Sequence, residues 1–102
     1  MQNIQEKKVI PEDSDFWQLI QKAIEEESPS FTSNLMWLLG GKVKTPDLHT
    51  ALLIKCNVTP TQMTWLFGKS AGAISSRRES MSVRIFGKNV GNATIDNVIK
   101  CL

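Results

Sequence analysis

The stretch that most constrains the fold is residues 59–87, because it contains the start and stop signals of two consecutive helices. Thr59 is a favourable N-cap, and Pro60 suits the first position of a helix. Gln62 stands where a capping box needs Glu or Gln. Gly68 can end this first helix in the left-handed conformation. The pattern predicts a short helix whose two ends are both specified locally.

A second, longer helix follows directly. The signals predict helices over 60–67 and 71–86, with Ser70 as the cap of the second. Apolar residues in 71–86 recur at spacings of seven and four and therefore share one face; they are Ile74, Met81 and Ile85. A short capped helix, a tight turn containing glycine and a longer basic helix are typical of a helix-turn-helix.

The rest of the chain also predicts helices and no strand. Residues 1–13 are polar and resemble a linker, 14–44 predict an N-terminal extension of two helices, and 45–102 predict the helix-turn-helix domain. The expected buried positions are Phe16, Leu19, Ile20, Ala23 and Ile24; Phe31, Leu35, Leu38 and Leu39, with Trp37 partly buried; Leu48, Ala51, Leu52 and Ile54, with Leu53 and Cys56 beside them; and Ile95, Val98, Ile99 and Leu102. Thr45, Asn57 and Asn92 are expected at helix ends. The predicted fold class is all-α, a small helical bundle.

Charge is distributed unevenly along the 102 residues. Residues 1–44 contain five Lys and Arg against seven Asp and Glu, a net charge of −2. Residues 45–102 contain seven against three, a net charge of +4. The basic excess falls on the part with the helix-turn-helix pattern, which favours a polyanion as partner.

The sequence does not favour an enzyme. The single histidine, His49, has no ligand at metal spacing and is expected on the surface or on a supporting helix. The segment GKNVG at 87–91 resembles a phosphate loop but lacks the GK[ST] ending and a preceding strand. Cys56 and Cys101 have no CxxC spacing and predict buried reduced thiols. We therefore expect no catalytic residue, cofactor, metal or small-molecule substrate.

The chain contains no apolar run of membrane-spanning length and no signal peptide, which favours a cytoplasmic location. The polar start, QNIQEKK, is compatible with one end of a longer protein. The expected location and the expected longer parent chain are both inferred independently of the helix-turn-helix pattern.

Residues 45–102 resemble the C-terminal DNA-binding domain of LuxR/NarL-type regulators. The resemblance is in LLIKCNVTPTQM, which matches a support helix and the entry to the next helix, and in KSAGAISSRR, which contains Ser70 and Ile74. FTSNL and LFGKSAGAISSRR are similar to the variant found at the C-termini of membrane-anchored bacterial sensors. The resemblance implies four helices (a support helix, the helix-turn-helix pair and a closing helix), double-stranded DNA as partner, a homodimer on two half-sites, and a longer sensor chain upstream.

The resemblance also implies which residues meet DNA. With Ile74 pointing into the core and 100° per residue, Ser76 and Val83 point outward on 71–86, and Arg78 falls near the core edge. The candidate base-facing residues are Gly72, Ser75, Ser76 and Glu79. The candidate phosphate contacts are Lys69, Ser70, Arg77, Arg78, Arg84 and Lys88. About four such contacts, from Lys69, Arg77, Arg84 and Lys88, predict a slope of log affinity against log salt near −3.6.

Trp65 and Leu66 depart from the family, which is usually charged and exposed at these positions. Two adjacent large apolar side chains need a cover, which either the N-terminal helices or a second protomer would supply. They are therefore interface candidates. They also support an alternative function, in which the helix-turn-helix fold serves as a protein–protein interaction or dimerisation module of a signalling protein.

Overall fold

The computed structural model describes residues 9–102, and this part consists of six helices and no strand. The helices are α1 (Asp15–Glu27), α2 (Phe31–Leu38), α3 (Thr45–Lys55), α4 (Pro60–Phe67), α5 (Ala71–Phe86) and α6 (Asn92–Lys100). The all-α prediction is confirmed, and the predicted helices over 60–67 and 71–86 have the observed bounds. Residues 1–8 of the predicted linker lie outside the described residues. Within the described part, no helix combines the length and apolar character needed to cross a bilayer.

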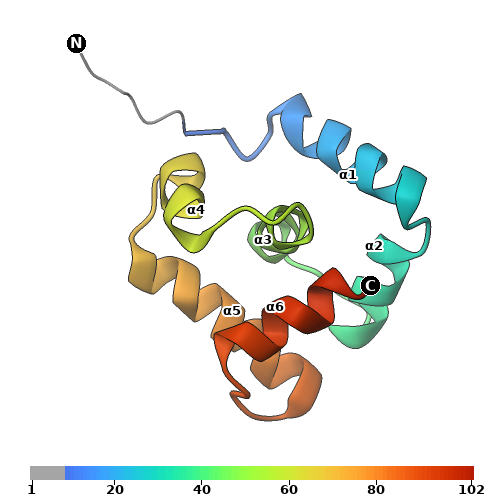
Figure 1. Ribbon diagram of the computed structural model, residues 1–102, viewed down its shortest axis with the longest axis vertical. Coiled ribbons are helices and arrows are strands. Elements are labelled where there is room, and N and C mark those ends of the chain that lie inside the picture. Colours follow the sequence, from blue (N-terminus) through green and yellow to red (C-terminus); the bar gives the residue numbers. More distant parts are fainter. Residues whose placement is uncertain (1–8) are drawn as a thin grey trace.

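Helix α3 lies at the centre of the molecule. Figure 1 looks nearly along its axis and shows the other helices arranged around it. It packs against α1, α5 and α6. Four consecutive residues of α3, Ala51 to Ile54, are buried, so the helix is covered on all sides over this turn. An apolar run that surrounds a helix, in place of a single stripe, is what such a central position requires.

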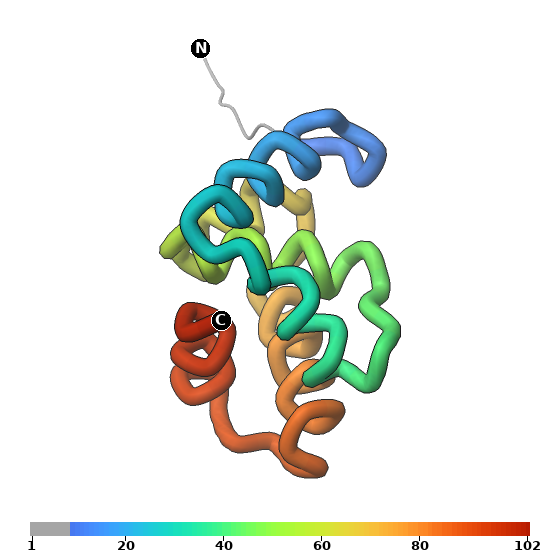
Figure 2. Tube along the Cα trace, turned by 90° about the vertical axis from the view of Figure 1, so that its right-hand side faces the viewer, coloured from blue at the N-terminus to red at the C-terminus, as the bar shows by residue number. Residues whose placement is uncertain are grey.

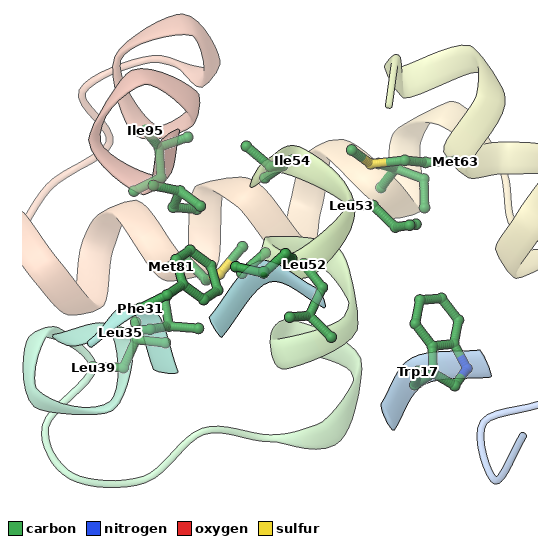
Figure 3. Packing of buried hydrophobic residues seen from close by; sticks show 14 residues of the cluster. Trp17, Phe31, Leu35, Leu39, Leu52, Leu53, Ile54, Met63, Met81 and Ile95 are labelled. Atoms are coloured by element: carbon green, nitrogen blue, oxygen red, sulfur yellow. The ribbon is translucent and has the colours of Figure 1, made fainter. Parts of the chain in front are cut away.

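A single hydrophobic core joins the N-terminal helices to the rest. The buried apolar residues are Trp17, Ile24, Phe31, Leu35, Leu39, Ala51, Leu52, Leu53, Ile54, Met63, Ile74, Met81, Ile95 and Ile99. Figure 3 shows Phe31 and Leu35 of α2, and Leu39 directly after it, beside Met81 of α5 and Leu52 of α3. Residues on both sides of position 44 therefore contribute to one packed cluster.

The helix ends follow the local signals. Thr59 and Gln62 form a reciprocal capping box, in which Thr59 Oγ1 accepts from the Gln62 amide at 3.1 Å. Gly68 ends α4 in the left-handed conformation at φ 65°, and Asn57 adopts φ 64° after α3. The prediction for Thr45 is wrong by one residue, since Lys44 occupies the cap position and Thr45 begins the helix.

In the N-terminal extension, Ile24, Phe31, Leu35 and Leu39 are buried as predicted, but one large side chain on each of its two helices departs from the prediction. On α1, Trp17 is buried at 3% exposure and Leu19 is 67% exposed. These positions are 200° apart on a helix, so burying Trp17 against its aromatic neighbours puts Leu19 in solvent. On α2, Trp37 is 79% exposed, again 200° from the buried Leu35. The prediction that Trp37 is partly buried is therefore wrong.

The thiols differ from expectation, whereas His49 lies on a helix that supports the others, which is one of the two placements expected for it. Cys56 and Cys101 are free but exposed, because each follows the last residue of its helix, where the chain turns towards solvent. Partial burial of the Cys56 thiol nevertheless raises its pKa above the ordinary value. His49 is buried on α3, not on the surface, and its ring stacks on Trp17 at 4.0 Å between centroids.

Residues 9–13, which we name the strap, run over the end of α4 before α1 begins. The Ile10 amide donates to the Leu66 carbonyl at 2.7 Å, and the Trp17 indole N–H donates to the Pro11 carbonyl at 2.9 Å. Figures 1 and 2 show this segment passing beside α4 on its way to α1. The strap therefore ties the first helix to the turn between α4 and α5.

Candidate nucleic-acid interface

The turn from α4 to α5 is held by backbone and side-chain hydrogen bonds. The amide of Gly68 and that of Lys69 both donate to the Thr64 carbonyl, the second at 3.2 Å. Ser70 Oγ accepts from the Ala73 amide at 3.1 Å and caps α5. Because both sides of the turn are tied to their own helices, the angle between α4 and α5 is fixed locally.

The outward side of α5 is open among the described residues. Gly72, Ser76, Glu79 and Val83 are all exposed, as their spacing from the buried Ile74 predicts. The helix has 16 residues and is therefore about 24 Å long. This side presents small and weakly polar groups along most of that length.

Ser75 is only half-exposed because it contacts the next helix. Its hydroxyl accepts from the Asn92 side-chain amide at 3.1 Å and donates to the Glu79 carboxylate at 3.4 Å. Asn92 was expected to cap α6, but Gly91 holds the cap position and Asn92 is the first helical residue. Ser76 and Glu79 are therefore the polar side chains best exposed on this side of α5.

Arg78 is buried and paired with Asp96 of α6. Its Nε donates to Asp96 Oδ1 at 3.0 Å, and its Nη2 donates to Oδ2 of the same carboxylate. A bidentate pair of this kind satisfies most of the guanidinium's fixed donors. The prediction of Arg78 as a phosphate contact is therefore corrected: the side chain connects α5 to α6 inside the molecule.

Arg84 is likewise engaged within the chain. Its Nη2 donates to the Leu39 and Lys42 carbonyls, the second at 2.7 Å, and its Nη1 lies 3.7 Å from the Asp47 carboxylate. Burial raises the pKa of the Asp47 carboxyl above its ordinary value, and the charge of Arg84 opposes that rise. Arg84 thus holds the end of α2 and the loop after it, while the residue stays exposed, and its role as a phosphate contact stays a prediction.

Arg77 lies half-buried against an aromatic ring. Its guanidinium carbon is 4.6 Å from the centroid of Phe67, the last residue of α4. Its Nη1 is sheltered from solvent and has no acceptor among the described residues. Arg77 and Arg84 are seven residues apart and point to the same side of α5, which faces α3 and the end of α4.

The exposed cations around α5 are lysines. Lys69 precedes the helix and Lys88 follows it, and both are exposed, as is Ser70. The Ser82 hydroxyl donates to the Lys88 carbonyl at 3.1 Å and accepts from the Val90 amide at 2.9 Å, which fixes the loop holding Lys88. Two predicted phosphate contacts thus lie at opposite ends of α5.

Sequence reasoning missed two further lysines near α5. Lys42 and Lys44 stand in the loop that Arg84 holds, and both are exposed. The contact that brings them to α5 joins residues 42 positions apart, so no local pattern in the sequence indicates it.

The apolar pair on α4 is partly covered by the strap, which takes the place of the predicted N-terminal helices. Leu66 packs against the core and its carbonyl accepts from Ile10. Trp65 remains 47% exposed and, with Val58, Gln62 and Leu66, lines a shallow hollow of about 310 Å³. An interface at Trp65 stays a prediction.

The described residues contain no group of three His, Cys, Asp or Glu side chains placed to hold a metal ion. The candidate nucleic-acid interface consists of the open side of α5, with lysines at its flanks. No protein-family model, curated protein or solved structure with which the chain was compared matches it.

Proposed function

We propose that this chain is a DNA-binding domain of a transcriptional regulator, of the helix-turn-helix type that its sequence resembles. Helix α5 would enter the major groove, and α4 would lie across the backbone. The observation that carries the proposal is the open side of α5, where Gly72, Ser76, Glu79 and Val83 are exposed over a helix long enough to cross the groove. An α-helix of this kind fits the major groove of B-DNA.

The groups on α5 favour modest sequence discrimination. The Ser76 hydroxyl can donate to or accept from base edges, and the Glu79 carboxylate can accept from a cytosine amino group. No arginine is available on this side to make a bidentate contact with guanine, since Arg78 and Arg84 bind within the chain. A single domain is therefore expected to bind weakly, and a dimer on two half-sites would supply the remaining affinity.

Lysines supply the phosphate contacts in this proposal. Lys69 and Lys88 mark the two ends of α5, and Lys42 and Lys44 stand in the loop held by Arg84. Two contacts would give a slope of log affinity against log salt of about −1.8, and four would give about −3.6. A location in the cytoplasm and a membrane-anchored sensor upstream belong to the same proposal, supported by the sequence resemblance.

The test is binding of the chain to a labelled random-sequence duplex pool, followed by fluorescence anisotropy over a series of salt concentrations. We expect a negative slope between the two limits above, and Lys69→Ala should make it shallower by about 0.9 while weakening binding to all sequences alike. Lys22→Ala is the matched control, because Lys22 is an exposed lysine on α1, which packs on α2 and α3. A slope that Lys69→Ala leaves unchanged would remove Lys69 from the interface.

The exposed Trp65 favours a second candidate function, a protein-interaction module. Trp65 and the hollow beside it offer an apolar anchor on α4, and tryptophan is enriched at the centres of protein interfaces. In that case association would depend on Trp65 and be indifferent to salt and to Lys69. Comparison of Trp65→Ala with Lys69→Ala in the same chain separates the two functions.

A further inference from the structure

A second feature of the molecule lies away from the open side of α5. A hollow of about 280 Å³ lies between the strap, the first turn of α1, the start of α3, the end of α4 and the near side of α5. Its principal walls are Pro11, Trp17, His49, Phe67, Lys69 and Arg77. Three parts of the chain, around residues 9–17, 46–49 and 67–77, thus meet around one concave site, which is where small ligands bind most often.

One wall of the hollow is a stack of aromatic rings. His49 lies parallel to Trp17, with 4.0 Å between centroids and 7° between planes. Trp17 in turn lies parallel to Phe67, with 5.5 Å between centroids and 8° between planes. Trp17 is further fixed by its hydrogen bond to the Pro11 carbonyl. Trp17 and His49 are 3% and 6% exposed, so the half-buried ring of Phe67 is the member of the stack that is most open to the hollow.

The polar groups at this hollow are mainly cationic. Lys69 and Arg77 line it, against the single carboxylate of Glu12. No described residue accepts a hydrogen bond from the Arg77 guanidinium, and its Nη1 is buried without a partner. A buried charged donor that has no acceptor costs more free energy than one that is paired. The site therefore has an unmet requirement for an acceptor, and a negatively charged one suits it best.

His49 adds a neutral donor or acceptor. Burial lowers the pKa of the His49 imidazole, the charge of Glu12 opposes this, and the charge of Arg77 lowers it further. Arg77 and Lys69 consequently provide the positive charge of the hollow, while the imidazole contributes to its flat wall.

We propose that this hollow binds a small organic carboxylate with a flat apolar body. The carboxylate would lie against Arg77 and Lys69, and the apolar body against Phe67 and Pro11. A planar carboxylate matches the fork of a guanidinium, whereas inorganic phosphate would leave the apolar wall without a partner. Because such a ligand would touch both the strap and α5, its binding would fasten the strap to the α4–α5 turn. The proposal does not depend on DNA binding: the hollow shares Lys69 with the lysines proposed to contact phosphate but also uses Arg77 and Phe67, which are not among those contacts.

The test uses the whole chain and benzoate as the probe, followed by ¹H–¹⁵N NMR. We expect saturable shifts of the Trp17 indole N–H and of the Arg77 side-chain N–H, with a Kd in the millimolar range or tighter. Benzyl alcohol, which has the ring without the charge, should bind at least about tenfold more weakly, as should inorganic phosphate.

Two variants test the assignment of the cations. Arg77→Met should weaken benzoate binding by about tenfold or more, and Lys69→Met, which alters an exposed side chain and leaves the core untouched, should weaken it severalfold. Lys88→Met is the matched control and should bind as the wild type does. Absence of a saturable shift at Trp17, equal binding of benzyl alcohol or phosphate, or full binding by Lys69→Met and Arg77→Met would each overturn the proposal.

Discussion

The three arginines of α5 have different surroundings although they share one helix. Arg78 pairs with a carboxylate on α6, Arg84 donates to two backbone carbonyls, and Arg77 stacks on a phenylalanine ring. From the sequence they were all candidates for phosphate contact. Helical spacing indicated that Arg78 lies near the core edge, but the partners of the three arginines come from residues 10 to 45 positions away.

The Arg78–Asp96 pair gives a prediction about stability. Arg78→Leu would leave the Asp96 carboxylate partly buried without its partner, so we expect the free energy of unfolding to fall by about 3 kcal/mol. Urea unfolding measures this change. The double variant Arg78→Leu with Asp96→Leu should recover most of the loss, because no unpaired charge remains. A double variant as unstable as the single one would contradict the assignment of this pair.

At the scale of the element, local chemistry decided the helix bounds. The capping box of Thr59 and Gln62, the Ser70 cap and the left-handed Gly68 all lie within a few residues of the ends that they specify, so the sequence was sufficient to locate α4 and α5. The burial of Trp17 on α1 was harder to predict. Trp17 is buried because α3 and α4 offer His49 and Phe67 to it, and nothing within α1 indicates that contact.

Gly68 and Gly72 are expected to respond in opposite ways to substitution by alanine. An added Cβ at Gly72 would meet nothing closer than Ser70 Oγ at 3.9 Å, so Gly72→Ala should stabilise the fold by about 0.5–1 kcal/mol. At Gly68, with φ 65°, an added Cβ would lie 2.9 Å from Val9 Cγ2, so Gly68→Ala should destabilise by more than about 1 kcal/mol.

Thermal or urea unfolding of both variants checks these signs. Gly72→Ala also tests whether glycine is needed for close approach to a phosphate or base. A more stable variant that loses affinity for DNA would indicate that need, and one with unchanged affinity would show that the glycine has no such role. If Gly72→Ala unfolded more easily than the wild type, the space seen beside Gly72 would not exist in solution.

At the scale of the whole molecule, the aromatic stack joins helices that the sequence divides between an extension and a domain. His49, Trp17 and Phe67 come from α3, α1 and α4, and Arg77 of α5 lies over Phe67. Together with the shared core, this stack packs α1 and the end of α4 into one unit. Such long-range packing could not be predicted from periodicity, which describes one helix at a time.

The stack predicts a dependence of stability on pH. Because burial lowers the pKa of His49 below its ordinary value of 6.5, the unfolded chain takes up a proton before the folded chain does as pH falls. Stability should therefore decrease as pH drops through 6.5 towards the folded-state pKa and should be fully present above 6.5. Glu12 opposes this shift and Arg77 enlarges it.

His49→Phe isolates this contribution, because phenylalanine can stack on Trp17 and cannot be protonated. Urea midpoints measured from pH 7.5 downwards should fall more steeply for the wild type than for His49→Phe. All other titrating groups are common to both chains and cancel in the difference. Parallel curves would mean that His49 has the same pKa in the folded and unfolded states.

The open side of α5 also determines which amino-acid substitutions the protein can accept without loss of stability. Along this helix the residues that hold the fold, such as Ile74 and Met81, are separate from those that face outward, such as Ser76 and Glu79. Substitutions at the outward positions leave the core unaltered and are expected to be nearly neutral for folding. A new partner preference can therefore arise, or be selected in a library, one exposed residue at a time without rebuilding the scaffold.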